Sequence, residues 1–201
     1  MKNIMLFKNL DYEFISNNFI IKDFNINELL FNEGEDCKYF GVLLEGELKV
    51  STLTNNDQEY TINILHKGDI FGETLLFLEN NNYLGDGIIT KKSKIAFISK
   101  DKLLTLLSNK IFLSNYLETL ANKTEKINFR MKLLSQKSIE NKIMFYLYSE
   151  KKKRNTNVIN IPSKEKLAQL LNIPRPSLSR ELIKLKEKKI ILYDKYKITI
   201  L

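Results

Sequence analysis

Residues 163–187 decide the fold of the second half of the chain, and they read SKEKLAQLLNIPRPSLSRELIKLKE. Ser163 is a typical N-cap, because its hydroxyl can accept a hydrogen bond from the first turn of a helix. That helix is expected to end at Leu171, because the residue before Pro174 avoids the helical region. Pro176 suits the first turn of a second helix, where its missing N–H is not needed. The stretch therefore predicts two helices joined by a tight turn.

Short strands are predicted on both sides of this helix pair. Residues 158–161 precede the first helix, and residues 190–193 and 196–200 follow the second around Asp194-Lys195. The second helix is expected to run to about Lys188, and its predicted inner face consists of Leu178, Leu182, Ile183 and Leu185. Strand, helix, turn, helix and hairpin in this order are typical of a winged helix-turn-helix, whose second helix enters the major groove of DNA.

The polar side of the second helix carries side chains that suit DNA. Arginine can bond guanine through both arms and serine can bond a base edge, so Arg180 is the best base-reading candidate. The start of the first helix suits backbone phosphates, as do Lys152, Lys153 and Lys195. A winged helix that contacts proteins is the alternative. The predicted DNA-binding residues are Ser163, Lys164, Arg175, Pro176, Ser177, Ser179, Arg180 and Lys184.

Charge divides the chain into two unlike parts. Residues 1–110 contain 12 Lys, no Arg and 16 Asp plus Glu, a net charge of −4. Residues 111–201 contain 20 Lys plus Arg and 8 Asp plus Glu, a net charge of +12. This asymmetry indicates that the second half meets a polyanion, although a basic surface that serves only solubility is the alternative.

All seven glycines of the chain lie in the acidic half, between residues 34 and 87. Short apolar runs with turns about every 8–12 residues are typical of a β-sandwich or small barrel. Asn55-Asn56-Asp57 is predicted to form a hairpin turn. We expect short helices at 11–18 and at 101–108, the latter beginning at Asp101. The predicted strands are 40–44, 48–53, 60–65, 87–90 and 94–98.

Residues 110–135 contain neither Gly nor Pro, and their apolar positions are spaced alternately four and three apart. This heptad pattern predicts a helix of about 25 residues, close to ~38 Å long. The narrow stripe with charged flanks favours a homodimeric coiled coil, and a helix lying on its own β module is the alternative. The stripe consists of Leu113, Leu117, Leu120, Thr124, Ile127, Met131 and Leu134. A further helix is predicted at 138–148, followed by an exposed basic loop at 151–154.

The segment Leu167–Leu182 resembles the helix-turn-helix of the cyclic-AMP receptor/FNR (CRP/FNR) family of bacterial transcription regulators. Three glycine-turn segments resemble those of the family's cyclic-nucleotide-binding β-roll: 32–35, 44–50 and 67–73. The resemblance implies a homodimer on a pseudo-palindromic operator, with DNA-binding domains reoriented by an effector or another signal. RNA polymerase would be a further partner if the protein activates transcription.

Together these features predict an α+β protein in three parts. Residues 1–108 are expected to form a β-roll sensor domain, resembling the jelly roll of cyclic-nucleotide-binding proteins. Residues 109–136 are expected to form a long dimerisation helix. Residues 137–201 are expected to form a winged helix-turn-helix DNA-binding domain.

The effector site departs from the family pattern. In cyclic-nucleotide binders, the Gly and Glu of a Phe-Gly-Glu motif approach the ribose, and a downstream Arg-Ser or Arg-Thr pair holds the phosphate. Gly72 and Glu73 are present, but residues 81–86 contain no Arg. A buried phosphate needs a charged partner, so we expect an effector other than cyclic AMP, or none. The resemblance places the effector pocket at Phe71, Gly72, Glu73, Thr74, Tyr83 and Leu84.

Cysteine and histidine are too few for several kinds of site. One Cys and one His exclude a disulfide framework, a cysteine-ligated iron–sulfur cluster and a multi-histidine metal site. We predict no metal and no cofactor. A haem- or redox-sensing regulator of the same family, using His66 or Cys37, stays an alternative. So does a cyclic-nucleotide-domain-like binding protein that does not act on DNA.

Enzyme and membrane functions are not expected. The sequence has no nucleophile elbow, Walker loop or dinucleotide fingerprint, and a metal-dependent β-roll enzyme would need more histidines. No apolar run approaches the ~20 residues that span a bilayer, and the N-terminal apolar stretch is too short for a secretory signal. We therefore expect a cytoplasmic protein with no membrane partner.

Overall fold

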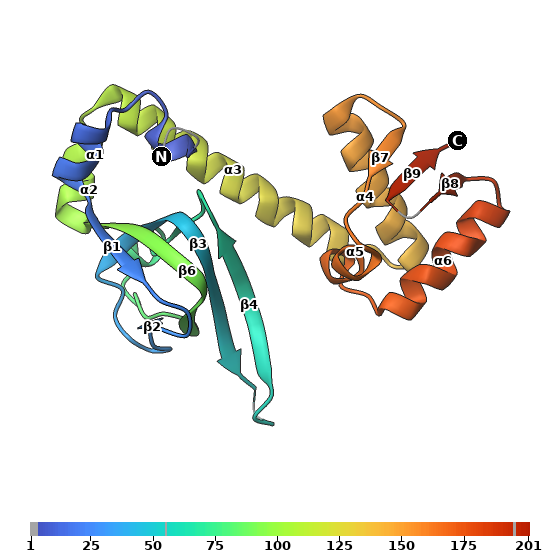
Figure 1. Cartoon of the computed structure of the whole chain (residues 1–201), viewed down its shortest axis with the longest axis horizontal. Coiled ribbons are helices and arrows are strands. Elements are labelled where there is room, and N and C mark those ends of the chain that lie inside the picture. The colour runs from blue at the N-terminus through green and yellow to red at the C-terminus, as the bar shows by residue number, and fades with distance from the viewer. Residues whose placement is uncertain (1–3, 55, 195) are drawn as a thin grey trace. The chain divides into compact units, whose positions relative to one another are not determined.

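The computed structural model describes residues 4–54, 56–194 and 196–201 of the chain (Figure 1). It consists of two compact units, Met1–Ala121 and Asn122–Leu201. The division falls within α3 (Lys110–Leu134), a continuous helix that confirms the helix expected from the heptad pattern.

The first unit is built on an antiparallel sheet with the strand order β1-β6-β3-β4, to which β2 and β5 add short pairings. Its strands are β1 (Ile20–Phe24), β2 (Leu29–Phe31), β3 (Tyr39–Leu53), β4 (Glu59–His66), β5 (Ile70–Phe71) and β6 (Asp86–Ser99). The unit also contains η1 (Met5–Phe7), α1 (Tyr12–Asn18), η2 (Leu75–Phe77) and α2 (Lys100–Leu106). The predicted β-roll is confirmed.

Two pairs of predicted strands proved to be single bent strands. The runs 40–44 and 48–53 both belong to β3, and 87–90 and 94–98 both belong to β6. The register of the β3–β6 pairing shifts between residues 43 and 48, so the strands bend without separating. Gly46 lies at this bend with φ +92°, and a Cβ there would collide with Ser93. Glycine is therefore required at the bend.

The predicted helices of the first unit are confirmed with shifted boundaries, because 11–18 is Tyr12–Asn18 and 101–108 is Lys100–Leu106. Asp11 caps α1, because its side chain accepts a hydrogen bond from Phe14 N at 2.6 Å. Helix α2 begins at Lys100 rather than Asp101, because Ser99 is its N-cap. The predicted hairpin turn at 55–57 includes Asn55, which lies outside the described residues.

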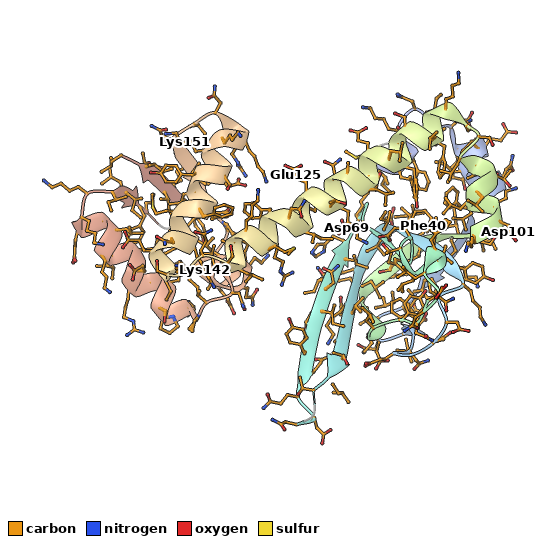
Figure 2. All side chains as sticks on the ribbon, turned by 180° about the vertical axis from the view of Figure 1, so that it is seen from behind. Phe40, Asp69, Asp101, Glu125, Lys142 and Lys151 are labelled. Atoms are coloured by element: carbon orange, nitrogen blue, oxygen red, sulfur yellow. The ribbon has the colours of Figure 1, made fainter. Side chains whose placement is uncertain are left out.

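Hydrophobic side chains form two cores in the first unit. One core joins the sheet to α1 and the first half of α3, and it includes the fully buried Phe40 (Figure 2) and Phe112. Asn115 fastens α3 to the N-terminal turn, donating to the carbonyls of Leu6 and Lys8. The other core lies inside the roll and consists of Phe31, Leu43, Leu48, Leu65, Phe71, Ile89 and Ile95.

The second unit is the predicted winged helix-turn-helix. Its elements are α4 (Ile139–Arg154), β7 (Val158–Asn160), α5 (Lys164–Leu171), α6 (Arg175–Glu187), β8 (Ile191–Tyr193) and β9 (Lys197–Ile200). The strands form a sheet in the order β7-β9-β8. Lys195, at the predicted tip of the hairpin, lies outside the described residues.

The basic run at 151–154 is helical, and the prediction of a loop there was wrong. Lys142 and Lys151 lie near the two ends of α4 (Figure 2). Glu150 explains the extension, because it pairs with Arg154 at 2.9 Å and with Lys153 at 3.9 Å along the helix. Cations are also favourable at a helix C-terminus, and α4 ends only at Asn155, which has a left-handed conformation.

Within residues 4–54, 56–194 and 196–201, no helix has both the length and the apolar character needed to cross a membrane.

Candidate nucleic-acid interface and sensor pocket

Helix α6 has a buried face and an exposed face. Leu178, Leu182 and Leu185 are fully buried in the core of the second unit. Ile183 was predicted for this face but is 47% exposed, because it is rotated by about 100° from Leu182 around the helix axis. Of the predicted DNA-binding residues on α6, Arg175, Pro176, Arg180 and Lys184 are exposed, and Ser177 and Ser179 are half-buried.

The cationic side chains Arg180 and Lys184 of α6 make weak contacts with neighbouring side chains. Arg180 Nη2 lies 3.5 Å from Ser177 Oγ, and Lys184 Nζ lies 3.6 Å from a carboxylate oxygen of Glu181. Exposed contacts of this kind contribute little to stability. Both side chains can therefore exchange these contacts for phosphates or base edges.

The start of α5 holds a second group of cations. Ser163 is the N-cap, because its Oγ accepts a hydrogen bond from Lys166 N at 3.3 Å. Lys164 Nζ lies 4.9 Å from the ring centre of Tyr193, and Lys186 Nζ lies 5.8 Å from the same ring. The ring holds both ammonium groups by cation–π attraction. Sequence reasoning missed this cluster, because its three members come from α5, α6 and β8.

The turn between α5 and α6 fixes the angle at which α6 is presented. Asn172 has φ +51°, and its N–H donates to the last carbonyls of α5. Pro174 is the N-cap of α6, and Pro176 lies in the first turn as predicted. At the other end, Lys188 Nζ binds Glu140 Oε2 of α4 at 2.8 Å, and this contact raises the pKa of Lys188.

The predicted effector residues Gly72, Glu73 and Thr74 form the connection between β5 and η2. Gly72 has φ +77°, and a Cβ there would lie 2.9 Å from Cys37 Sγ. Glu73 is 3% exposed, and its Oε1 accepts a hydrogen bond from Thr74 Oγ1 at 3.1 Å. Burial, and after it the Glu73 carboxylate, raises the pKa of Tyr116 on α3. Glu73 therefore lies close to α3.

Asparagines occupy the loop where cyclic-nucleotide binders carry their phosphate-holding pair. Asn82 Nδ2 donates to Gly34 O at 2.6 Å and to Asp36 Oδ1 at 3.1 Å. Asn81 Nδ2 donates to Cys37 O at 3.4 Å. Leu84, predicted for the pocket, is 74% exposed. The asparagines hold the loop itself in place.

A pocket of about 280 Å³ opens beside this loop. Phe71 and Tyr83 line it, but the other four predicted effector residues do not. Sequence reasoning missed the rest of the lining, although Ile20, Lys22 and Phe24 have the alternation that places them on one face of a strand. The remaining lining residues are Leu30, Phe31, Glu35, Asp36, Lys38, Tyr39 and Phe97.

Cys37 and His66, the two candidates for haem or redox chemistry, lie in unlike surroundings. Cys37 is 1% exposed, and burial raises the pKa of its thiol. His66 is exposed, with Nδ1 3.4 Å from Glu47 Oε2. Among the described residues, no three His, Cys, Asp or Glu side chains form a group that could hold a metal ion.

Two family models match the chain. Residues 21–110 match the cyclic nucleotide-binding domain, and residues 141–201 match the Crp-like helix-turn-helix domain. Over 104 residues the chain is 26% identical to the anaerobic regulatory protein of Bacillus subtilis (strain 168). That match covers 51% of this chain and 44% of the relative, so the chain spans less than half of the curated relative's length.

Solved structures share the fold over nearly the whole chain. The catabolite activator protein of Thermus thermophilus has a TM-score of 0.54 and 19% identity, covering 98% of this chain and 93% of that one. A mutant of CooA from Carboxydothermus hydrogenoformans has a TM-score of 0.65 and 15% identity, and the match covers 98% of this chain and 90% of that one. At these identities the likeness shows a shared fold.

Proposed function

Because the chain belongs to the CRP/FNR family of bacterial transcription regulators, we propose that it acts as a cytoplasmic homodimer that reads a pseudo-palindromic DNA site. The observation that carries this proposal is the exposed basic face of α6 in a half of the chain with a net charge of +12. A recognition helix needs a buried apolar face for anchorage and an exposed polar face for the groove, and α6 has both.

The proposed contacts divide into base readout and phosphate binding. Arg180 reads a base and Arg175, Ser177, Ser179 and Lys184 surround it on α6, with Pro176 in the first turn. Ser163 and Lys164 bind phosphates at the start of α5, where the backbone N–H groups also point outward. The Tyr193 ring keeps Lys164 in place without neutralising it.

The proposed dimer forms along α3. Leu117, Ile127, Met131 and Leu134 are between 42% and 64% exposed in the single chain. Leu113 and Leu120 are half-buried, and Thr124 is exposed. A row of large apolar side chains on one helix favours a partner, because their burial removes apolar surface from water. A second copy of α3 offers the same row, as a two-fold symmetric dimer requires.

We further propose that cyclic AMP is not the controlling effector. The loop at 81–86 uses Asn81 and Asn82 to hold its own backbone, and it offers no arginine to a cyclic phosphate. A ligand of another chemistry, or none, fits these residues better. If the regulator activates transcription, RNA polymerase is a further partner.

A DNA-binding comparison of two arginine variants tests the proposal. Arg180→Ala is expected to weaken binding to a selected site by about 1–3 kcal/mol and to relax its sequence preference. Arg154→Ala is the matched control, because Arg154 lies in the same unit but pairs with Glu150 on α4. Equal affinities of the two variants for the selected site would contradict the assignment of α6.

A further inference from the structure

Helix α6 presents a row of exposed side chains on the face opposite the core. The helix lies at the outside of the second unit, with α4, α5 and β8 on one side of it (Figure 1). Leu178 and Leu185 are fully buried on that side. At about 100° per residue, the exposed Pro176, Arg180 and Ile183 lie within ~60° of one another and point directly away from these two leucines. The row is therefore the part of α6 that lies nearest to whatever the helix binds.

Cationic side chains lie on both sides of this row. Arg175 and Lys186 are on one side and Lys184 is on the other, each turned by about 70–110° from the middle of the row, and all three are exposed. Glu187 ends the row at the last residue of α6, beyond the turns with which such helices contact bases. A helix in the major groove has base edges in front of it and a phosphate backbone at each side. The flanking cations suit the two backbones, so the row suits the base edges.

Ile183 is the member of the row that needs an apolar partner. Its side chain is 47% exposed, whereas its neighbours Leu182 and Leu185 are fully buried. A single exposed apolar residue is ordinary at a protein surface, but this one lies one turn beyond Arg180, in the row that suits the base edges. The alkyl group that the major groove displays is the C5-methyl group of thymine, and the other recognition groups there are hydrogen-bond donors and acceptors.

We propose that Ile183 contacts the C5-methyl group of a thymine within two base pairs of the guanine that Arg180 reads. The contact rests on the proposed function, because it requires α6 to lie in the major groove. Ile183 follows Arg180 by about 4.5 Å along the helix axis, little more than the ~3.4 Å between successive base pairs. Its branched side chain has one strongly preferred rotamer in a helix, so it loses little freedom on contact. Ile183 is thus a specificity-determining residue.

The burial of one methyl group sets the size of the expected effect. Such burial is equivalent to about fourfold in affinity. A two-fold symmetric dimer makes the contact once in each half-site, so removal of both methyl groups should weaken binding by about 15-fold.

Deoxyuridine in place of thymine tests the contact, because it removes only the methyl group and keeps the base pair. Fluorescence anisotropy compares the full chain on its selected duplex and on duplexes with deoxyuridine at each symmetric pair of thymines within two base pairs of the guanine. That guanine is the one whose preference Arg180→Ala loses. We expect the wild-type chain to lose about 15-fold in affinity at one such position. A selected site with no thymine there, or equal binding of all these duplexes, would overturn the proposal.

Ile183→Ala removes the protein side of the same contact. The variant should bind the thymine and deoxyuridine duplexes equally at that position and keep its preference for the guanine, and Ile183→Val should keep most of the discrimination. Leu192→Ala is the matched control, because Leu192 is 51% exposed in the same unit but lies on β8 rather than on α6. The control should discriminate as the wild-type chain does. An equal deoxyuridine penalty in the wild-type chain and Ile183→Ala would show that another group reads the methyl and refute the assignment.

The outcomes separate a failure of this contact from a failure of the proposed function. A chain that selects no DNA sequence would refute the proposed function and the contact with it. A chain that selects a site through Arg180, but whose preference for the methyl group does not depend on Ile183, would refute the contact alone.

Discussion

Ile127→Asp is expected to break the proposed dimer. Ile127 is 52% exposed in the single chain, so a partner helix can bury about half of its surface. Full burial of such a side chain contributes about 1.5–3 kcal/mol, so each copy contributes about 0.8–1.5 kcal/mol. The two copies together contribute about 1.5–3 kcal/mol, equivalent to about 10- to 150-fold in Kd. Two carboxylates at one seam add repulsion and desolvation, so this range is a lower bound.

Sedimentation equilibrium measures this change directly, with circular dichroism to show that the helices remain. Ile111→Asp is the matched control, because Ile111 lies on the same helix, is 47% exposed and lies outside the seam. The control should dimerise as the wild-type chain does. A dimer Kd for Ile127→Asp within twofold of the wild-type value would refute the seam. So would an equal loss of dimer in both variants.

Three further outcomes are expected. Leu182→Ala should lower the free energy of unfolding by about 2–5 kcal/mol in urea denaturation, because Leu182 is fully buried, whereas Ile183→Ala should change it by less than about 0.5 kcal/mol. Lys184→Gln should weaken DNA binding equally for all sequences and lower the salt slope by about one, as fluorescence anisotropy at several salt concentrations would show; an unchanged slope would remove Lys184 from the phosphate contacts. Burial raises the pKa of Cys37 above its ordinary 9.0, so its contribution to stability is complete below that value and is lost as pH rises through the folded-state pKa. Urea titrations from pH 7 to 10 should show this loss in the wild-type chain and a smaller one in Cys37→Ala, and equal losses in both would contradict it.

The helix-turn-helix could be predicted from sequence because local chemistry determines it. Ser163 can begin a helix, Pro174 prevents its continuation and Pro176 permits a new start, and none of these effects needs a distant partner. The predicted end of α4 at residue 148 was wrong, although the interactions that extend the helix are also local. Four consecutive cations are typical of a loop, but here the pairing with Glu150 and the helix C-terminus both favour a helix.

The candidate sites were harder to predict because they depend on tertiary pairing. Lys164 and Tyr193 are far apart in the chain, and only the folded second unit brings them together. The pocket requires the register that sets Ile20 opposite Phe97, which no local pattern specifies. A family motif could indicate Phe71 and Tyr83, but not the aromatic wall around them.

Selection from a random duplex DNA library with the purified chain tests the central claim, that α6 reads a specific sequence as part of a dimer. The account predicts an enriched two-fold symmetric site with half-site centres about 34–36 Å apart. It also predicts that Arg180→Ala loses the preference while still binding DNA nonspecifically. An enriched site identical for the wild-type chain and Arg180→Ala would contradict the claim, as would no enrichment by a chain that is dimeric, with or without cell extract added.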